Sequence, residues 1–109
     1  MRIKVQHCKD ADRDHEASHR SYAHTHHKPG VICVASAYWS LPETYQLGLL
    51  LHEIGHLLAR SKDHTEEDAN RIVERASGIK IWYRDGKAGP EVEWIRPEDR
   101  GKAREFLGL

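Results

Sequence analysis

The pattern of hydrophobic and polar positions predicts two strands in the first part of the chain. Residues 2–7 alternate polar and apolar side chains, which is typical of a half-buried strand. After the turn signal Pro29-Gly30, residues 31–39 are mainly β-branched and apolar, and we expect a second strand there. The polar residues 9–28 between them fit either a short exposed helix or an irregular loop.

The next segment predicts a long helix from Ser40 to about Arg60. Ser40 and Glu43 have the spacing of a capping box, and Pro42 is tolerated in the first turn. One broad face of this helix is apolar. It carries Leu47, Leu50, Leu51, Ile54, Leu57 and Leu58. Small residues gather on a neighbouring face, where a strand or loop could approach the backbone closely. They are Gly48, Gly55 and Ala59.

A second, shorter helix is predicted from Thr65 to Gly78. Thr65 and Asp68 form another capping box, and glycine is the typical residue at a helix end. The apolar stripe of this helix repeats at helical spacing. It consists of Ala69, Ile72, Val73 and Ala76.

The last third of the chain predicts two more strands and a terminal helix. The strands are residues 79–84 and 92–95, with a turn at Asp85-Gly86, and the helix is residues 97–107. The sequence contains no linker, internal repeat or low-complexity segment. We therefore expect one α+β domain, residues 1–109, with a short antiparallel or mixed sheet packed on the long helix and on the second helix.

Composition limits the classes of partner. The 109 residues carry 17 Lys and Arg against 17 Asp and Glu, and a net charge of zero argues against nucleic acid as a partner. No apolar run reaches the roughly 18 residues of a membrane span, and the N-terminus lacks the apolar core of a signal peptide. Cys8 and Cys33 are too few for a disulfide scaffold, so we expect free thiols and a cytoplasmic location. The nine histidines are the unusual feature.

Five residues of the long helix, His52-Glu53-Ile54-Gly55-His56, have the H-E-x-x-H pattern. Residues four apart lie one turn apart on the same helix face, so both imidazoles can reach one Zn²⁺. The intervening Glu53 can then hold a water molecule and accept its proton. Leucines flank the pattern on both sides, which places it in a buried helix, where unpaired imidazoles would be costly. We therefore predict His52 and His56 as zinc ligands.

The same pattern occurs a second time, in His15-Glu16-Ala17-Ser18-His19. Asp14 and Arg20 bracket this copy, and no apolar stripe accompanies it. Its histidines would lie on a solvated surface, where ligands are poorly preorganised. We interpret this copy as a chance match. A solvated loop rather than a second metal site is also the simpler interpretation of His24, His26 and His27.

A catalytic zinc ion needs a third protein ligand and an open position. Ala59 and Lys62 stand where the extended metzincin pattern requires Gly and His, which excludes that class. The candidates after the long helix are Asp63, His64, Glu66, Glu67 and Asp68. Glu66 is favoured because it lies beside Asn70, on the edge of the face that turns toward the long helix. His64 stays an alternative because imidazole is the more usual zinc ligand.

Four features between residues 30 and 70 occur together. They are the strand start Gly30-Val31-Ile32, a Leu-Pro pair, the block Leu-Leu-His-Glu-Ile-Gly-His-Leu-Leu, and Glu66-Glu67-Asp68-Ala69-Asn70. In this combination the chain resembles the ImmA/IrrE family of small zinc metallopeptidases. The resemblance implies a zincin-like domain of the gluzincin kind, Zn²⁺ ligands His52, His56 and Glu66, and Glu53 as catalytic base. It also implies cleavage of a repressor-like regulatory protein in a phage or mobile-element context. The chain departs from the family in a shorter gap between His56 and Glu66 and in Ser77-Gly78-Ile79, which replaces a Leu-Met-Pro-like segment.

We therefore expect a zinc metalloendopeptidase that acts on a peptide or protein substrate. Zinc would polarise the scissile carbonyl, and Glu53 would pass the water proton to the leaving amine. The oxyanion donor stays open among Tyr45, Tyr38 and the three histidines before Pro29. Residues 31–39 are the expected edge strand on which an extended peptide would add.

A non-catalytic protein-interaction module, stabilised by zinc, is the alternative to an enzyme. The carboxylate between the two histidines argues against it, because a structural zinc site has no need of one.

Overall fold

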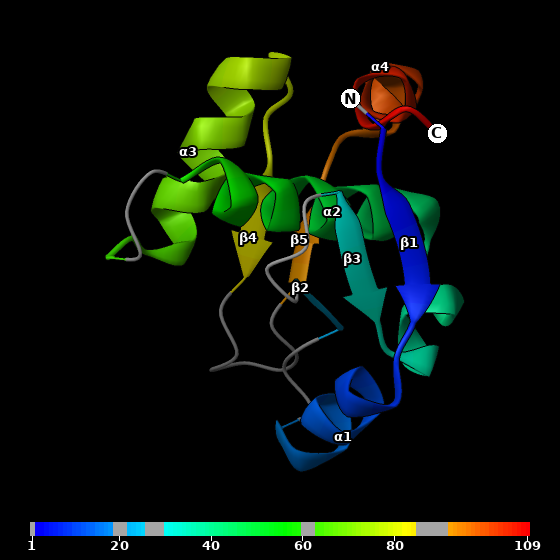
Figure 1. Cartoon of the computed structure of the whole chain (residues 1–109). Coiled ribbons are helices and arrows are strands. Elements are labelled where there is room, and N and C mark those ends of the chain that lie inside the picture. Colours follow the sequence, from blue (N-terminus) through cyan, green and yellow to red (C-terminus); the bar gives the residue numbers. More distant parts are fainter. Residues whose placement is uncertain (1, 19–21, 26–29, 60–62, 85–91) are drawn as a thin grey trace.

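Helix α2 (Glu43–Leu58) crosses the middle of the protein, and the other layers pack around it (Figure 1). The computed structural model describes residues 2–18, 22–25, 30–59, 63–84 and 92–109. All nine residues from Leu47 to Gly55 are buried. A helix that is buried all round must have partners for every polar group it carries, and His52 and Glu53 belong to this segment.

Two small sheets lie against α2. In the first sheet the strand order is β1–β3–β2, with β1 (Lys4–His7) parallel to β3 (Val31–Val34) and β2 (Ala23–Thr25) antiparallel to it. In the second sheet β4 (Trp82–Arg84) pairs antiparallel with β5 (Val92–Trp94). The predicted α+β class, with short mixed and antiparallel sheets on helices, is confirmed.

The position of β3 corrects one expectation. We expected the strand of residues 31–39 to be an edge that a peptide could extend, but β3 lies in the centre of its sheet and is paired on both sides. The edges among the described strands of this sheet are β1 and β2. Since β2 falls within a polar segment without strand periodicity, the local pattern did not predict it.

The strand predicted over residues 31–39 is also shorter in the structure. It ends at Val34, and the 3-10 helix η1 (Ser36–Ser40) follows. The Oδ1 atom of Asp12 accepts the N–H of Ser36 at 2.7 Å and so stabilises the start of η1. This contact joins residues 24 positions apart in the sequence, so the local pattern does not contain it.

The capping box predicted at Ser40 and Glu43 does not form. Ser40 is the last residue of η1, and α2 begins at Glu43 behind Pro42 without a side-chain hydrogen bond at its N-cap. Instead, the side-chain amide of Gln46 donates to the carbonyl of Leu41 at 3.0 Å. A side chain from the first turn of α2, that of Gln46, therefore stabilises the start of this helix.

The other helices agree well with the sequence pattern. The open alternative for residues 9–28 is decided in part by α1 (Lys9–Ser18), which is helical. Helix α3 (Glu66–Ser77) begins with the predicted capping box of Thr65 and Asp68 and ends at Gly78, whose φ is +73°. The last helix, α4 (Arg100–Leu107), follows the 3-10 turn η3 (Pro97–Asp99). The turn predicted at Asp85-Gly86 lies outside the described residues.

Two glycines of α2 are contact points for other elements, as their position on one helix face predicted. A Cβ on Gly48 would lie 2.6 Å from Cα of Trp94, and a Cβ on Gly55 would lie 2.1 Å from the carbonyl oxygen of Ala69. Both distances are too short for real atoms. Glycine thus lets β5 approach one end of α2 and lets α3 approach the other end.

The two cysteines are not free thiols. Cys8 and Cys33 form a disulfide that joins the end of β1 to the central strand β3, across 25 positions of sequence. In the parallel register of β1 and β3, Gln6 lies opposite Cys33, and Cys8 follows the end of β1 with its Cα 5.5 Å from that of Cys33. The expectation of free cysteines was wrong because it rested on their number and not on their proximity in the fold.

None of the helices among the described residues is both long enough and apolar enough to cross a bilayer.

Candidate metal centre

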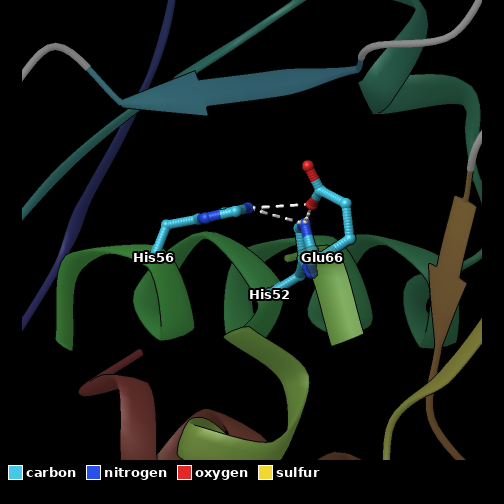
Figure 2. A group of neighbouring side chains, drawn as sticks. All are labelled: His52, His56 and Glu66. Atoms are coloured by element: carbon cyan, nitrogen blue, oxygen red, sulfur yellow. Dashed lines mark hydrogen bonds and ion pairs between the residues drawn. The ribbon is translucent and has the colours of Figure 1, made fainter. Parts of the chain in front are cut away.

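Three side chains converge above α2: His52 and His56 from α2, and Glu66 from the first turn of α3 (Figure 2). The Oε2 atom of Glu66 lies 2.5 Å from Nε2 of His52 and 2.9 Å from Nε2 of His56. The two Nε2 atoms are 3.1 Å apart. Three potential ligand atoms, from the residues predicted from the sequence, therefore lie close together.

The dimensions of this group fit a metal ion. A triangle with edges of 2.5, 2.9 and 3.1 Å has a point on each side of its plane that is about 2 Å from all three atoms, the usual length of Zn–N and Zn–O bonds. Two imidazole nitrogens and a carboxylate are a common ligand set of catalytic zinc. The side chain of His52 is 5% exposed, whereas that of Glu66 is 46% exposed. The group is thus open to solvent on one side, as a catalytic centre requires.

The helix spacing and one interhelical contact explain why these residues meet. His52 and His56 are one turn apart on α2, so their rings point to the same side. Glu66 is the first residue of α3, and the contact between Gly55 and Ala69 brings that end of α3 against α2. The capping box at Thr65 determines where α3 begins and hence where Glu66 lies.

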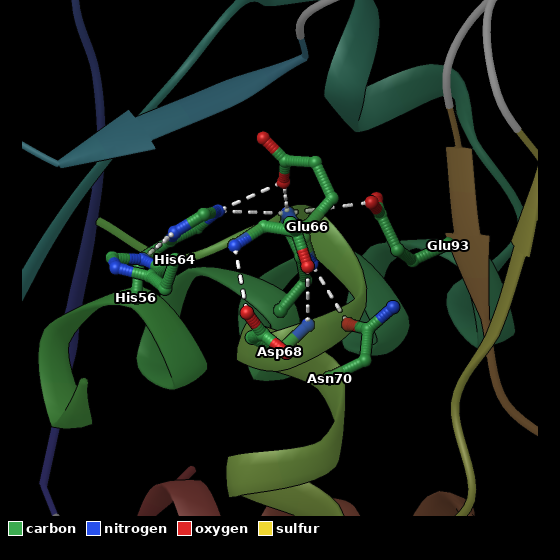
Figure 3. Close-up of polar contacts among 8 residues, drawn as sticks. His56, His64, Glu66, Asp68, Asn70 and Glu93 are labelled. Carbon is green, nitrogen blue, oxygen red and sulfur yellow. Dashed lines mark hydrogen bonds and ion pairs between the residues drawn. The ribbon is translucent and has the colours of Figure 1, made fainter. Parts of the chain in front are cut away.

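The ring nitrogens that face away from the centre have hydrogen-bond partners (Figure 3). Nδ1 of His52 lies 2.8 Å from Oδ1 of Asn70, which is buried, and Nδ1 of His56 lies 2.7 Å from Nε2 of His64. Such outer partners orient metal-binding histidines and select the tautomer that leaves Nε2 free for the ion. His64, the alternative third ligand, therefore lies behind His56 and outside the three-atom group.

The charges around His52 are unusual for a buried residue. Burial by itself lowers the pKa of His52, but the hydrogen bond with Glu66 and the charges of Glu93 and Glu53 outweigh burial and raise the pKa to about 9. Hydrogen bonds from His52 and His56 hold the pKa of Glu66 well below its ordinary value. The group therefore favours a cation at its centre, either a proton or a metal ion.

Glu53, the predicted base, lies on the buried part of α2 and is 9% exposed. Its charge acts on His52, which places its carboxylate in the same electrostatic environment as the three-atom group. A carboxylate in this environment can accept a proton from a water molecule at the centre.

Glu93 is a residue of the centre that the sequence analysis missed. It belongs to β5, is 2% exposed, and its Oε1 lies 3.4 Å from Nε2 of His52. The available signal was an acidic residue inside the short apolar segment Val92-Glu93-Trp94-Ile95. Asn70 was seen only as a neighbour of Glu66, and its contact with His52 comes from the packing of α3 on α2.

The structure describes four of the five residues of the second H-E-x-x-H copy. Residues 15–18 lie on α1, and the ring centroids of His15 and Tyr22 are 4.5 Å apart. His19 lies outside the described residues. His26 and His27 also lie outside them. In the part of the chain that is described, His52, His56 and Glu66 form the one group with metal-binding geometry.

The candidate oxyanion donors differ in their surroundings. Tyr38 is 2% exposed within the hydrophobic core, and burial raises the pKa of its hydroxyl. The ring of Tyr45 packs against that of Trp94, with 5.8 Å between the ring centroids. Nε2 of His24, on β2, lies 3.5 Å from Oδ2 of Asp10. Core packing thus argues against Tyr38 as the donor.

Comparison with known proteins gave no match: no protein-family model, no curated protein and no solved structure is significantly similar to this chain.

Proposed function

We propose that this protein is a zinc-dependent endopeptidase of the kind that the ImmA/IrrE resemblance implies. The observation that carries the proposal is the convergence of His52, His56 and Glu66 on one point. The charge of the buried Glu53 acts on one of these ligands, His52. A bound Zn²⁺ would polarise the scissile carbonyl and make a water molecule acidic enough to lose its proton near neutral pH.

The chain's own residues have distinct tasks in this proposal. His52, His56 and Glu66 hold the ion, and Asn70 and His64 orient the two imidazoles. Glu53 accepts the proton of the water molecule and then donates it to the leaving amine. The open side of the centre, beside the half-exposed Glu66, is where a substrate reaches it.

An edge strand near the centre suggests how a peptide would bind. β2 packs on α2 and passes over the three side chains in Figure 2. It is an edge of its sheet among the described strands. We therefore assign to β2 the docking role first expected of residues 31–39: an extended peptide would add beside Ala23–Thr25 through main-chain hydrogen bonds.

The repeated motif supplies a matched control for the test. The protein would be analysed for bound zinc and incubated with a peptide library and with repressor-like proteins, as wild type, Glu53→Gln and Glu16→Gln. We expect one equivalent of zinc in all three proteins, cleavage by the wild type and by Glu16→Gln, and loss of cleavage in Glu53→Gln. Glu16 occupies the same motif position on the exposed face of α1, so equal cleavage by all three proteins would contradict the proposal.

The cellular setting belongs to the same proposal. The resemblance implies an enzyme that acts on a regulatory protein. Its cytoplasmic location was expected from free thiols, but disulfides such as Cys8–Cys33 are rare in the reducing cytosol. A peptidase acting in an oxidising compartment would keep this bridge, so fractionation of the source cells followed by thiol labelling distinguishes the two settings.

A zinc-stabilised interaction module is the second candidate. It is favoured by the position of the ligands, which link α2 to α3 in a chain with a small core, where a metal can stabilise the fold. Bound zinc that raises the melting temperature, with no cleavage that depends on Glu53, would support this candidate instead.

A further inference from the structure

We infer that Glu93 is the counter-charge of the metal centre, a buried carboxylate that balances the positive charge left on a divalent ion after the three ligands have bound. The inference rests on the metal centre proposed above. It assigns a task to a residue that lies 27 or more positions beyond the other carboxylates of the centre and outside every motif of the sequence.

A cation nearby stabilises a carboxylate as deeply buried as that of Glu93. Its side chain is 3% exposed, and Oε1 lies 3.4 Å from Nε2 of His52 (Figure 3). An ionised carboxylate in such a place is strongly destabilising unless a positive group compensates it. One atom within reach of the carboxylate is the Nε2 of His52, the same nitrogen that would bind the ion. The carboxylate is thus directed at the position that carries the positive charge.

The three-atom group does not include Glu93, although Oε1 of Glu93 lies 3.4 Å from one member of the group, Nε2 of His52. The ligand atoms of His52, His56 and Glu66 all lie within 4.8 Å of one another, and Glu93 is not a member of this group. Two ligands of one zinc ion are at most about 4.4 Å apart, because each bond is about 2.0–2.2 Å long. Glu93 therefore acts on the ion through its charge and through His52, as a positioning residue.

The backbone holds Glu93 firmly in this position. The close approach at Gly48 seats the backbone of Glu93 and Trp94 on α2, four residues before His52. The N–H of Ile95 donates to the carbonyl of Thr44 at 3.2 Å, which ties the end of β5 to the first turn of α2. Both contacts hold the strand at Glu93 and at the two residues that follow it.

The three ligands leave a positive charge on which a further carboxylate can act. A divalent ion with two neutral imidazoles and one carboxylate, Glu66, keeps one positive charge. Glu53 also lies in this environment, but in the proposed reaction it exchanges a proton with the water molecule. Glu93 takes no part in that proton transfer, so we assign to its carboxylate the task of stabilising the positive charge beside His52.

Metal affinity tests this assignment directly. The dissociation constants of Zn²⁺ and Co²⁺ would be measured by competition with a chelator for the wild type, Glu93→Gln, Glu105→Gln and Val92→Ala. Glu93→Gln keeps the shape of the side chain and removes its charge. Glu105→Gln removes the same charge from an exposed position of α4, and Val92→Ala weakens the packing of β5 without a change in charge.

We expect Glu93→Gln to bind both ions about 10- to 100-fold more weakly than the wild type. Glu105→Gln should match the wild type, and Val92→Ala should lose less affinity than Glu93→Gln. The Co²⁺ absorption spectrum should be the same in wild type and Glu93→Gln, because the ligand set is unchanged. A Glu93→Gln affinity within threefold of the wild type, an equal loss in Val92→Ala, or an altered Co²⁺ spectrum would each overturn the assignment. Failure of the wild type to bind either ion would instead overturn the proposed centre itself.

Discussion

Gly55 of α2 and Ala69 of α3 are in direct backbone contact: a Cβ on Gly55 would lie 2.1 Å from the carbonyl oxygen of Ala69. Glu66 and Asn70, which contact the histidines of the candidate centre, lie on the same turns of α3 as Ala69. The geometry of the centre therefore depends on the absence of a side chain at Gly55.

Gly55→Ala is expected to damage both stability and metal binding. The added methyl group must push α3 away from α2, at a cost of roughly 1–3 kcal/mol in the free energy of unfolding. Glu66 moves with α3, so zinc affinity should fall by about tenfold or more. Urea unfolding and chelator competition measure the two effects.

Gly101→Ala is the matched control for this substitution. Nothing lies within 4 Å of a Cβ at Gly101, which is an exposed position of α4. The same change there should raise stability by up to about 1 kcal/mol, because alanine is the better helix former. A Gly55→Ala protein as stable as Gly101→Ala would contradict the close packing of α3 on α2.

Substitutions of Glu66 and His64 identify the third ligand. Glu66→Ala removes an oxygen within 3 Å of both Nε2 atoms and should reduce bound zinc well below one equivalent. His64→Ala removes only the partner of Nδ1 of His56, so bound zinc should stay near one equivalent with a dissociation constant up to about tenfold higher. Metal analysis after dialysis measures the zinc that remains bound to each of the two variants. The reverse order of effects would make His64 the ligand.

The metal-free and zinc-bound proteins should respond to pH in opposite directions. In the metal-free protein the pKa of His52 is about 9, above its ordinary 6.5, so the folded state holds this proton more tightly than the unfolded chain does. The resulting stability is complete below pH 6.5 and is lost as pH rises toward 9. The lowered pKa of Glu66 contributes stability above pH 4.5 that is lost in acid. Zinc must displace the proton of His52, so its affinity rises over the same range.

Melting curves with a chelator and with excess zinc, taken between about pH 6 and pH 8, test this contrast. We expect the difference in melting temperature between the two conditions to grow with pH. Glu66→Gln lacks the main partner of His52 and should lose most of the pH dependence of the metal-free protein. A metal-free wild type that becomes more stable from pH 6 to pH 8 would contradict the ion pair.

The Cys8–Cys33 bridge should make a measurable contribution to stability. It closes a loop across 25 positions, and loop-closure entropy for that length corresponds to about 3 kcal/mol. Reduction with dithiothreitol, or the double substitution Cys8→Ala with Cys33→Ala, should lower the melting temperature by more than about 10 °C. The double variant should not respond further to the reductant. Two titratable thiols in native protein purified without reductant would show that the bridge is absent.

Much of the candidate centre could be predicted because its parts are local. The spacing of His52 and His56 is a property of any helix, and the leucines around them require that helix to be buried. The capping box at Thr65 likewise marks where the next helix begins, which placed Glu66 at the edge of its buried face. Each of these inferences needs only residues a few positions apart.

Tertiary structure decided the features that join distant segments. Asp12 accepts the N–H of Ser36 at the start of η1. The pairing of β1 with β3 brings the two cysteines near each other, and β2 pairs with β3 to become an edge near α2. The periodicity of the sequence predicts none of these contacts, because each joins segments that come together only in the folded chain.

The sequence by itself therefore determined the α+β class and which helix carries the two histidines, since helical spacing and apolar patterning are local properties. Only the tertiary structure decided the outer partners Asn70 and His64 and brought Glu93 to His52. The physical reason is burial. Gly48 and Gly55 let β5 and α3 approach α2 so closely that buried polar side chains from three elements, namely His52, Asn70 and Glu93, lie together and must satisfy each other's hydrogen bonds and charge.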